Sequence, residues 1–427
     1  MKASWYIKNA RIVDPASGRD YTGNLFVENA RFAPPPLTVP DDAITIDASG
    51  LVAVPGFTDL HVHLREPGNE AAETVASGCR AAAQGGFTTV VAMPNTTPAL
   101  DCPEQVFALG NRAEACGLAR VLPAPCITRG RAGKSLTDFH ALVQAGAVAF
   151  TDDGSTVADD ALMADAMRQA RALNRPIFDH ALDHTLAGRG VMHAGGCSSK
   201  LGLPGISSEA ETVVVARDIR LAAETGCAVH IQHLAAAGSV GLIRDARSRG
   251  IAISAELTPH HLALTDADVL PDRADRFKMN PPIRAASDRT SLIEAICDGT
   301  IECFATDHAP HTVEAKSKGF IGAPFGVVGL ETAIGVTFTL LVKPGRMPLA
   351  DWIARWTLGP ARILGHAAPT LAIGAPADFA LLDLSTEWTA HADAFASKSR
   401  NTPFEDWPLT GRAVWTFLGG NPIHGGA

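Results

Sequence analysis

Eight short apolar segments, each followed by a stretch with helical spacing, limit the fold of residues 55–310 more than any other feature. The segments are GFTDLHVHL, FTTVVAMPN, RVLPAPCI, AVAFTDDG, PIFDHAL, AVHIQHL, IAISAELTP and IECFATDHAP. Between them lie Ala-rich stretches such as SSEAETVVVARDIRLAAETG, which space apolar residues three or four apart and close on Gly, as helices commonly do. Repeated strand and helix units of this size predict an α/β fold, a (β/α)8 TIM barrel.

Both ends of the chain alternate apolar and polar residues with a period of two. SWYIKNARIVD and AITIDASG lie in the first part, and ADFALLDL and RAVWTFLGG lie in the last part. We therefore expect a small β-sandwich domain formed by residues 1–54 and 366–427, beside a barrel of residues 55–365. Residues 312–323 (TVEAKSKGFIGA) are charged and predict a surface loop near the barrel mouth.

Charge and composition narrow the class of partner. The 427 residues carry a formal net charge of −9 and no long basic stretch, which argues against nucleic acid and anionic membranes. No segment offers about 18 uninterrupted apolar residues, and the N-terminus lacks the apolar region of a signal peptide. Eight cysteines without CxxC pairs favour buried thiols over disulfides or a thiolate metal site. We predict a cytoplasmic protein that acts on small molecules.

The first barrel segment carries the clearest chemical pattern. Asp59, His61, His63 and Arg65 alternate with apolar residues, and a period of two places all four on one face of a strand. A lone buried histidine is more often a packing residue. Two imidazoles at this spacing, flanked by a carboxylate and a guanidinium, favour metal binding.

Further candidate ligands end the later segments. Asp152 and Asp153 lie in TDDG, His180 in FDHALD, His233 in HIQHL and Asp307 in ATDHAPH. The carboxyl ends of barrel strands meet at one mouth, so these side chains are expected to converge. Nitrogen and oxygen donors without cysteine favour a catalytic zinc site, with ligands enough for two metals. TDDG taken alone is more typical of a turn than of a metal site.

The remaining histidines have simpler interpretations. His230 falls on the opposite face of its strand from His233 and is expected to be structural. His184 and His193 lie in loops and are expected to be solvent-exposed. The adjacent pair His260 and His261 cannot both point at one site, so they are expected to pack around it.

Nine motifs together resemble the long-chain bacterial dihydroorotases of the amidohydrolase superfamily, over nearly the whole chain. The paired histidines and the final Asp are shared with hydantoinases, allantoinases and ureases, so they indicate only the superfamily. KMNPPIR, followed by ATDHAPH and APFG, is more specific. The resemblance implies reversible zinc-dependent hydrolysis of (S)-dihydroorotate to N-carbamoyl-L-aspartate in pyrimidine (UMP) biosynthesis. The motifs are DLHVHLREPG, MPNTTPALD, TDDG, FDHALD, HIQHL, ELTPHHL, KMNPPIR, ATDHAPH and APFGVVGLETA.

The resemblance also implies a ligand set for one or two zinc ions per subunit, with two favoured. One ion would be held by His61, His63 and Asp307, the second by His180 and His233, and Asp153 would bridge both. Many relatives carry a carboxylated lysine at the bridge, whereas AVAFTDDG contains no lysine. Its absence points away from hydantoinases and allantoinases. After His233 the chain reads LAAAGSV, where relatives often carry Val-Ser-Thr, and the loss of hydroxyls is expected to weaken the orientation of His233.

Substrate contacts follow from the same resemblance. The planar guanidinium of Arg65 suits a carboxylate on its own chemistry, with a surface salt bridge as the alternative. Asn95 and Asn280 each adjoin a proline and could instead shape turns. The resemblance assigns the substrate carboxylate to Arg65, Asn95 and His311, the ring to Asn280, its imide edge to the backbone of Phe325 and Gly326, and a further contact to His63.

The implied mechanism makes Asp307 the catalytic acid and base. It would take a proton from the attacking water and deliver it to the departing ring nitrogen. One alternative is another cyclic amidase, such as a hydantoinase, dihydropyrimidinase or allantoinase. A second is a non-catalytic subunit that scaffolds aspartate transcarbamoylase, which the complete ligand set disfavours. A homodimer and an aspartate transcarbamoylase partner both stay open.

Overall fold

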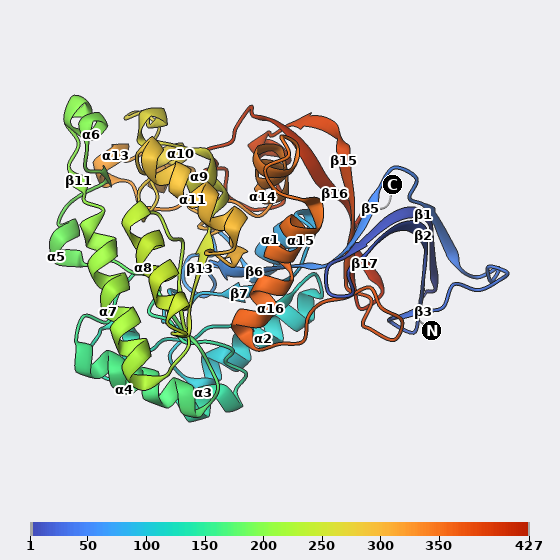
Figure 1. Cartoon of the computed structure of the whole chain (residues 1–427), viewed down its shortest axis with the longest axis horizontal. Coiled ribbons are helices and arrows are strands. Elements are labelled where there is room, and N and C mark those ends of the chain that lie inside the picture. The colour runs from blue at the N-terminus through green and yellow to red at the C-terminus, as the bar shows by residue number, and fades with distance from the viewer. Residues whose placement is uncertain (1–2, 426–427) are drawn as a thin grey trace.

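The computed structural model describes residues 3–425 and confirms the predicted α/β barrel (Figure 1). Seven of the eight apolar segments form short parallel strands, in one sheet of order β6-β7-β8 and another of order β9-β12-β13-β14. The strands are β6 (Phe57–Val62), β7 (Phe87–Ala92), β8 (Arg120–Pro123), β9 (Ile177–Asp179), β12 (Val229–Ile231), β13 (Ile253–Leu257) and β14 (Cys303–Phe304).

The one remaining segment, AVAFTDDG, lies between β8 and β9 and joins the two sheets without forming a full strand. The backbone N–H of Val148 donates to the carbonyl of Pro123 (3.0 Å), and Phe150 forms a single parallel bridge with Ile177. At the opposite seam, Val62 forms a parallel bridge with His308. These contacts connect β8 to β9 and β14 to β6, so the two sheets close into a ring.

Helices surround the ring, and their ends follow the capping signals of the sequence. The side chain of Thr74 caps the first helix by accepting from the backbone N–H of Ser77, and Gly226 ends the longest helix at a φ of 68°. The longer helices are α1 (Val75–Gln84), α2 (Pro103–Cys116), α4 (Asp160–Ala172), α7 (Glu209–Thr225), α8 (Ala237–Ser248), α11 (Ala286–Asp298), α15 (Leu349–Trp356) and α16 (Leu358–Leu364).

Shorter elements lie in the loops at the barrel mouth and between the longer helices. They are α3 (Phe139–Gln144), α5 (His184–Ala187), β10 (Met192–His193), α6 (Gly196–Leu201), β11 (Gly205–Ile206), α9 (Pro259–Ala263), α10 (Ala274–Phe277), α12 (Val313–Lys316), α13 (Gly319–Gly322) and α14 (Ala333–Thr337).

Aromatic packing closes the side of the barrel where the first strands begin. Trp352 of α15 lies 5.6 Å from the ring of Phe57, and Trp356 lies 5.2 Å from the ring of Phe87, both between ring centroids. All four side chains are fully buried. Burial of one such side chain contributes roughly 1.5–3 kcal/mol to stability, so this cluster anchors the last helices to the first strands.

Both ends of the chain contribute to one sheet beside the barrel (Figure 1). Although two strands lie between β1 and β16, the ring of Trp5 in β1 is 5.1 Å from that of Phe417 in β16, so the sheet curls around its own apolar core. The sheet order is β17-β16-β15-β5-β1-β2-β3, and β4 also pairs with β1. The strands are β1 (Trp5–Asp14), β2 (Arg19–Glu28), β3 (Arg31–Ala33), β4 (Ile44–Asp47), β5 (Val52–Pro55), β15 (Phe379–Thr389), β16 (Pro408–Leu418) and β17 (Asn421–His424).

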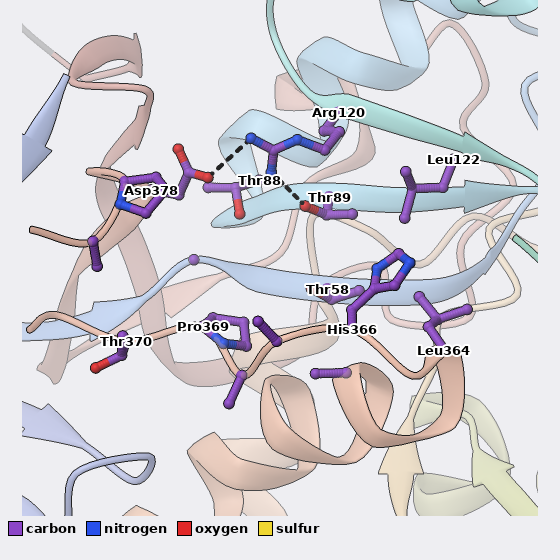
Figure 2. A pocket seen from close by; sticks show the side chains of 16 residues that line it. Thr58, Thr88, Thr89, Arg120, Leu122, Leu364, His366, Pro369, Thr370 and Asp378 are labelled. Carbon is purple, nitrogen blue, oxygen red and sulfur yellow. Dashed lines mark hydrogen bonds and ion pairs between the residues drawn. The ribbon is translucent and has the colours of Figure 1, made fainter. Parts of the chain in front are cut away.

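A cavity of about 250 Å³ lies where the terminal sheet meets the starts of the first barrel strands (Figure 2). Arg120 at the start of β8 spans it, with its guanidinium 3.1 Å from the carboxylate of Asp378 and 3.4 Å from the hydroxyl of Thr89. This ion pair ties the sheet to the barrel at the face opposite the strand ends that carry the predicted ligands. Within residues 3–425, no helix combines the length and apolarity that a bilayer crossing requires.

Candidate metal centre and active site

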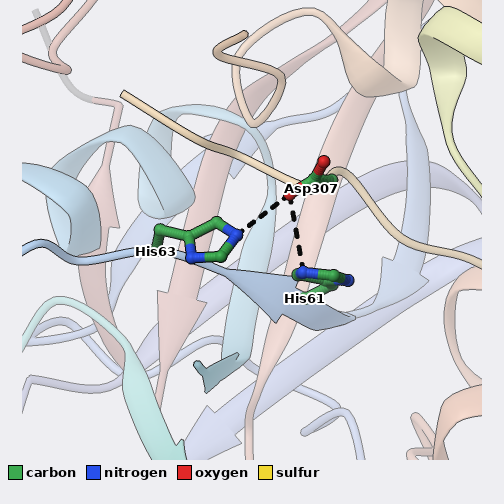
Figure 3. A group of neighbouring side chains, drawn as sticks. All are labelled: His61, His63 and Asp307. Carbon is green, nitrogen blue, oxygen red and sulfur yellow. Dashed lines mark hydrogen bonds and ion pairs between the residues drawn. The ribbon is translucent and has the colours of Figure 1, made fainter. Parts of the chain in front are cut away.

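The structure brings His61, His63 and Asp307 together at the carboxyl ends of β6 and β14 (Figure 3). Nε2 of His63 lies 3.0 Å from Oδ1 of Asp307, and Nε2 of His61 lies 3.4 Å from the same oxygen. All three side chains are buried. Three potential ligand atoms that face one point inside the protein form an arrangement typical of a metal site.

Asp153 connects this group to the two later histidines. One carboxylate oxygen of Asp153 lies 3.2 Å from Nε2 of His61 and 3.7 Å from Nδ1 of His180, and its other oxygen lies 3.6 Å from Nε2 of His63. Nδ1 of His180 is in turn 2.8 Å from Nε2 of His233. The six residues predicted as ligands therefore lie in one continuous cluster, with Asp153 between its two halves.

The cluster fits a divalent metal on the chemistry of its atoms. Nε2 of His61 is buried and has no hydrogen-bond partner. Nδ1 of His180 faces Nε2 of His233, and only one of these two nitrogens can carry the proton between them. At least one of them therefore presents a lone pair. A cation satisfies such lone pairs, and a set of imidazoles and carboxylates without thiolate suits a catalytic zinc or a similar ion.

Three residues of the barrel mouth have left-handed backbone geometry. The φ angles are 60° at Arg65, 32° at His233 and 46° at Asp307. Residues other than glycine rarely adopt positive φ, and such strain is concentrated at functional sites. Here it turns the chain at the ends of strands, where these three side chains line one cavity.

Glu256 of β13 supports the cluster from behind. Its carboxylate accepts from Nδ1 of His61 (2.7 Å), Nε2 of His230 (3.0 Å) and the backbone N–H of His233 (3.1 Å). Burial disfavours its charged form, but the charge of His61 and the hydrogen bond from His230 together hold the pKa at about 2. His230 is structural, as predicted, because it points away from the cluster to Glu256 and to the hydroxyl of Ser254.

Asp59 has a structural place behind the same strand. Its carboxylate accepts from the backbone N–H and hydroxyl of Thr306 and from the backbone N–H of His61. Complete burial raises the pKa of Asp59 to about 7. The shared face predicted for the first strand thus divides into His61 and His63, which face the cluster, and Asp59, which fixes β6 against the end of β14.

A carboxylate stabilises the segment LAAAGSV, which follows His233. The backbone N–H groups of Ala235 and Ala236 donate to Oε1 of Glu211 at 3.3 and 2.9 Å. The other oxygen of Glu211 lies 3.5 Å from the guanidinium of Arg284. The turn after His233 is therefore held without the hydroxyls of the Val-Ser-Thr run. Glu211 was not predicted from the sequence, because its only signal there is a carboxylate in the first turn of a helix.

A cavity of about 180 Å³ opens beside the cluster. Its size suits a small molecule more than a drug-sized ligand. The cavity wall contains every residue predicted to contact substrate and five of the six predicted ligands, while His61 lies behind it. The lining residues are His63, Arg65, Asn95, Asp153, Gly154, His180, His233, Asn280, Asp307, Ala309, His311, Phe325 and Gly326.

Arg65 gives one side of this cavity a positive charge. Its Nε donates to the carbonyl of Pro310 (3.1 Å), and burial lowers its pKa to about 10, so it stays protonated at neutral pH. Nε2 of His311 lies 2.7 Å from the carbonyl of Phe325 and 3.3 Å from the guanidinium of Arg65. Burial and Arg65 lower the pKa of His311 to about 3, so His311 is neutral.

Both predicted asparagines contact the histidine cluster. The amide of Asn95 bridges Nδ1 of His63 (2.8 Å) and a carboxylate oxygen of Asp153 (3.1 Å). The amide nitrogen of Asn280 lies 3.1 Å from Nε2 of His180. These contacts go beyond the turn-shaping role that the adjacent prolines allowed.

The other histidines considered in the sequence are not members of the candidate ligand cluster. His184 is exposed, whereas His193 is half-buried and 3.4 Å from the guanidinium of Arg284. His260 and His261 are buried beside the site, and His261 contacts the hydroxyl of Thr258 and the carbonyl of Pro281. All eight cysteines are free thiols, four of them buried.

Several known proteins of similar sequence are dihydroorotases. A dihydro-orotase-like family model matches residues 50–239. The dihydroorotase of Bacillus caldolyticus is 49% identical over 388 residues, which cover 91% of this chain and 90% of that protein. The dihydroorotase of Anaeromyxobacter dehalogenans (strain 2CP-1) is 46% identical over 422 residues, which cover 98% and 97%.

Several solved structures of similar fold are hydantoinases. The L-hydantoinase (dihydropyrimidinase) from Arthrobacter aurescens aligns with a TM-score of 0.86 at 24% identity, covering all of this chain and 96% of that one. The D-hydantoinase (dihydropyrimidinase) from Thermus sp. aligns with a TM-score of 0.85 at 22% identity. This likeness shows only the fold, which is the barrel with its terminal sheet. The sequence identity to dihydroorotases over most of the chain identifies the family. The chain belongs to the dihydroorotase family.

Proposed function

We propose that this protein is a metal-dependent dihydroorotase that interconverts (S)-dihydroorotate and N-carbamoyl-L-aspartate in pyrimidine biosynthesis. The observation that carries the proposal is the partly buried Arg65, whose guanidinium lines a small cavity beside the histidine and carboxylate cluster. Dihydroorotate combines a cyclic amide with a carboxylate, and a guanidinium binds a carboxylate in a planar, bidentate manner. The names of relatives with nearly half of their residues identical agree with this assignment.

The metal would be zinc, with two ions per subunit. His61, His63 and Asp307 would hold the first ion, His180 and His233 the second, and Asp153 would bridge them. When bound, the metal supplies an acidified water at neutral pH and polarises the amide carbonyl. No lysine occurs in AVAFTDDG, so the bridge would depend on Asp153 alone.

Asp307 would move the proton. Its Oδ1 lies beside the ring nitrogens of His61 and His63, and the residue also lines the cavity. In this position the carboxylate accepts a proton from the attacking water and returns it to the ring nitrogen as the amide bond breaks. In the synthetic direction the same carboxylate takes the proton from the attacking ureido nitrogen, and the bond closes with loss of water.

The other residues of the cavity wall would orient the substrate. Arg65, with His311 and Asn95 beside it, would hold the carboxylate, and His63 would contact the substrate near the metal. Asn280 would hold the ring, and the backbone of Phe325 and Gly326 would bind its imide edge. These groups come from four different loops of the barrel mouth, which fits a reaction that depends on placing one amide bond at the metal.

A substrate panel with metal control tests the proposal. Purified protein is assayed by ultraviolet absorbance with dihydroorotate, hydantoin, dihydrouracil and allantoin, before and after dialysis against a chelator and after zinc is restored. We expect activity on dihydroorotate that is lost with the metal and recovered with zinc. A preference for an uncharged ring would instead indicate another cyclic amidase, and inactivity on the whole panel would indicate a non-catalytic subunit. Light scattering, alone and with aspartate transcarbamoylase, tests for a homodimer and for that partner.

A further inference from the structure

Two lysines that the sequence places near the barrel mouth are buried. Lys278 is 2% exposed and Lys316 is 3% exposed. Within residues 3–425, neither ammonium nitrogen forms an ion pair with a carboxylate oxygen within 4 Å. Lysine is rarely buried without an acidic partner, because the ammonium loses its hydration. The two lysines therefore call for a specific explanation.

Backbone carbonyls replace that hydration. Nζ of Lys316 donates to the carbonyls of Lys278 (3.1 Å), Pro324 (3.1 Å) and Gly326 (2.8 Å), which uses all three of its donors. Nζ of Lys278 donates to the carbonyl of Ile321 (2.9 Å) and lies 4.7 Å from the ring centroid of Phe325. Each lysine thus reaches into the segment that carries the other.

The two linked segments form neighbouring parts of the cavity wall. Lys278 lies two residues before Asn280, and Lys316 holds the carbonyls on both sides of Phe325. The backbone N–H of Gly326 also donates to the carbonyl of Lys278 (2.9 Å). Gly326 has a φ of 130°, and a Cβ there would lie 2.7 Å from that of Ala309, so this backbone is closely confined.

We propose that Lys278 and Lys316 are positioning residues, which fix the backbone at 324–326 relative to Asn280 and so set the affinity for the substrate ring. The inference rests on the proposed function, since it assumes that this wall binds the ring. If the two lysines only supported the fold, their hydrogen bonds would not need to end on the segments that form the cavity wall. Here all four acceptor carbonyls belong to segment 321–326 or to Lys278, two residues before Asn280.

Three lysine-to-methionine variants test this role, because methionine keeps the length of the side chain without the donor. Lys316→Met and Lys278→Met are compared with Lys318→Met, a matched control on an exposed lysine two residues from Lys316. We expect KM for dihydroorotate to rise about tenfold or more, with kcat within about threefold, because binding is lost and the reacting groups are untouched. Lys318→Met should keep both constants. Lys316→Arg keeps donors and charge and should recover part of the affinity.

Limited trypsin digestion gives a readout that does not depend on activity. Cleavage after Lys318, followed by mass spectrometry, should be faster in Lys316→Met and Lys278→Met than in the wild type, because the segment 312–326 has lost its attachment. Circular dichroism and thermal unfolding report on the rest of the fold. Variants that lower the melting temperature but keep the wild-type KM would overturn the inference.

The remaining outcomes are also decisive. If Lys316→Met, Lys278→Met and Lys316→Arg all fail to fold, the lysines support the fold as a whole and the inference is wrong. A fall in kcat with unchanged KM would likewise contradict it. If the wild type does not act on dihydroorotate, the proposed function fails. That result is distinguishable from unchanged KM in folded variants of an active enzyme, which contradicts only the positioning role.

Discussion

Glu256 and His61 form a fully buried pair in which the carboxylate Oε1 lies 2.7 Å from the ring Nδ1. This contact fixes the proton of His61 on Nδ1, so that Nε2 faces the candidate metal. The same carboxylate oxygen accepts the backbone N–H of His233, which belongs to the other half of the cluster. One side chain that is not itself a ligand therefore aligns both halves.

Glu256→Gln should weaken metal binding by about 10–100-fold, the usual cost of losing a carboxylate behind a histidine ligand. The amide oxygen can still accept from His61, but the amide group adds a donor where His230 now donates. Zinc affinity is measured by competition with a chromophoric chelator.

Glu294→Gln serves as the control for this experiment, since Glu294 is an exposed carboxylate on α11. Wild-type zinc affinity in Glu256→Gln would show that Glu256 is not needed to orient His61. Comparison of the unfolding transitions of the two variants separates loss of metal from loss of fold.

Asp307→Asn should lower kcat by about 100–10,000-fold, the range for loss of one general acid and base. The fold should stay intact. Asparagine keeps the shape of the side chain but cannot carry the proton. Rates in both directions are measured on protein whose metal content has been determined. Asp393→Asn, at a fully exposed carboxylate, is the control. Normal turnover by Asp307→Asn would remove the residue from proton transfer.

Arg65→Ala should raise KM for dihydroorotate by about 10–100-fold, which corresponds to loss of charge-assisted hydrogen bonds worth about 1.5–3 kcal/mol. The effect should be specific for the carboxylate, so any residual rate with dihydrouracil should change little. Arg129→Ala, at an exposed arginine, is the matched control. An unaltered KM for dihydroorotate would place the substrate carboxylate elsewhere.

His261 should make the fold sensitive to acid. Its Nε2 lies 3.0 Å from the carbonyl of Pro281, its Nδ1 lies 2.8 Å from the hydroxyl of Thr258, and burial lowers its pKa to about 4. The unfolded chain takes up a proton below about pH 6.5 and the folded protein does not, so stability falls as the pH drops from 6.5 towards 4. Between pH 7 and pH 5 the loss from this residue is about 2 kcal/mol.

His261→Gln tests this linkage. The variant should lose about 2 kcal/mol less than the wild type when urea unfolding is compared at pH 7 and pH 5. Its stability at pH 7 should be lower, because the packing of the ring is lost. His140→Gln, at an exposed histidine of α3, should match the wild type in the size of the acid effect. Equal acid sensitivity in His261→Gln would mean that other groups dominate.

Local patterns were sufficient to predict the barrel and the convergence of the candidate ligand residues. The period of two in DLHVHL placed His61 and His63 on one face, and the common end of parallel strands brought them to Asp153, His180 and His233. The segment AVAFTDDG was only partly predictable. It has the composition of a strand, but it forms a single β-bridge, at Phe150. How much of the segment pairs depends on the two adjacent strands, and the segment's own sequence does not specify this.

Residues whose role depends on distant partners could not be predicted. Glu256 stands out in ELTPHHL only once the neighbouring strand β12 brings His230 and His233 to it. Lys316 lies in a charged segment that predicts solvent exposure, and it is buried because three carbonyls from elsewhere surround its ammonium group. Periodicity does not encode such contacts.

The pairing of β5 with β15 has a consequence for synthesis on the ribosome. Strand β15 joins β5 at residues 52–55 only after more than 300 further residues have been added, and β16 and β17 follow later still. Until then the growing polypeptide presents an unpaired strand edge at β5, the kind of edge that favours aggregation. Chaperone demand during translation should therefore depend on the last strands, and truncation before residue 379 should yield insoluble product even though the barrel segments are complete.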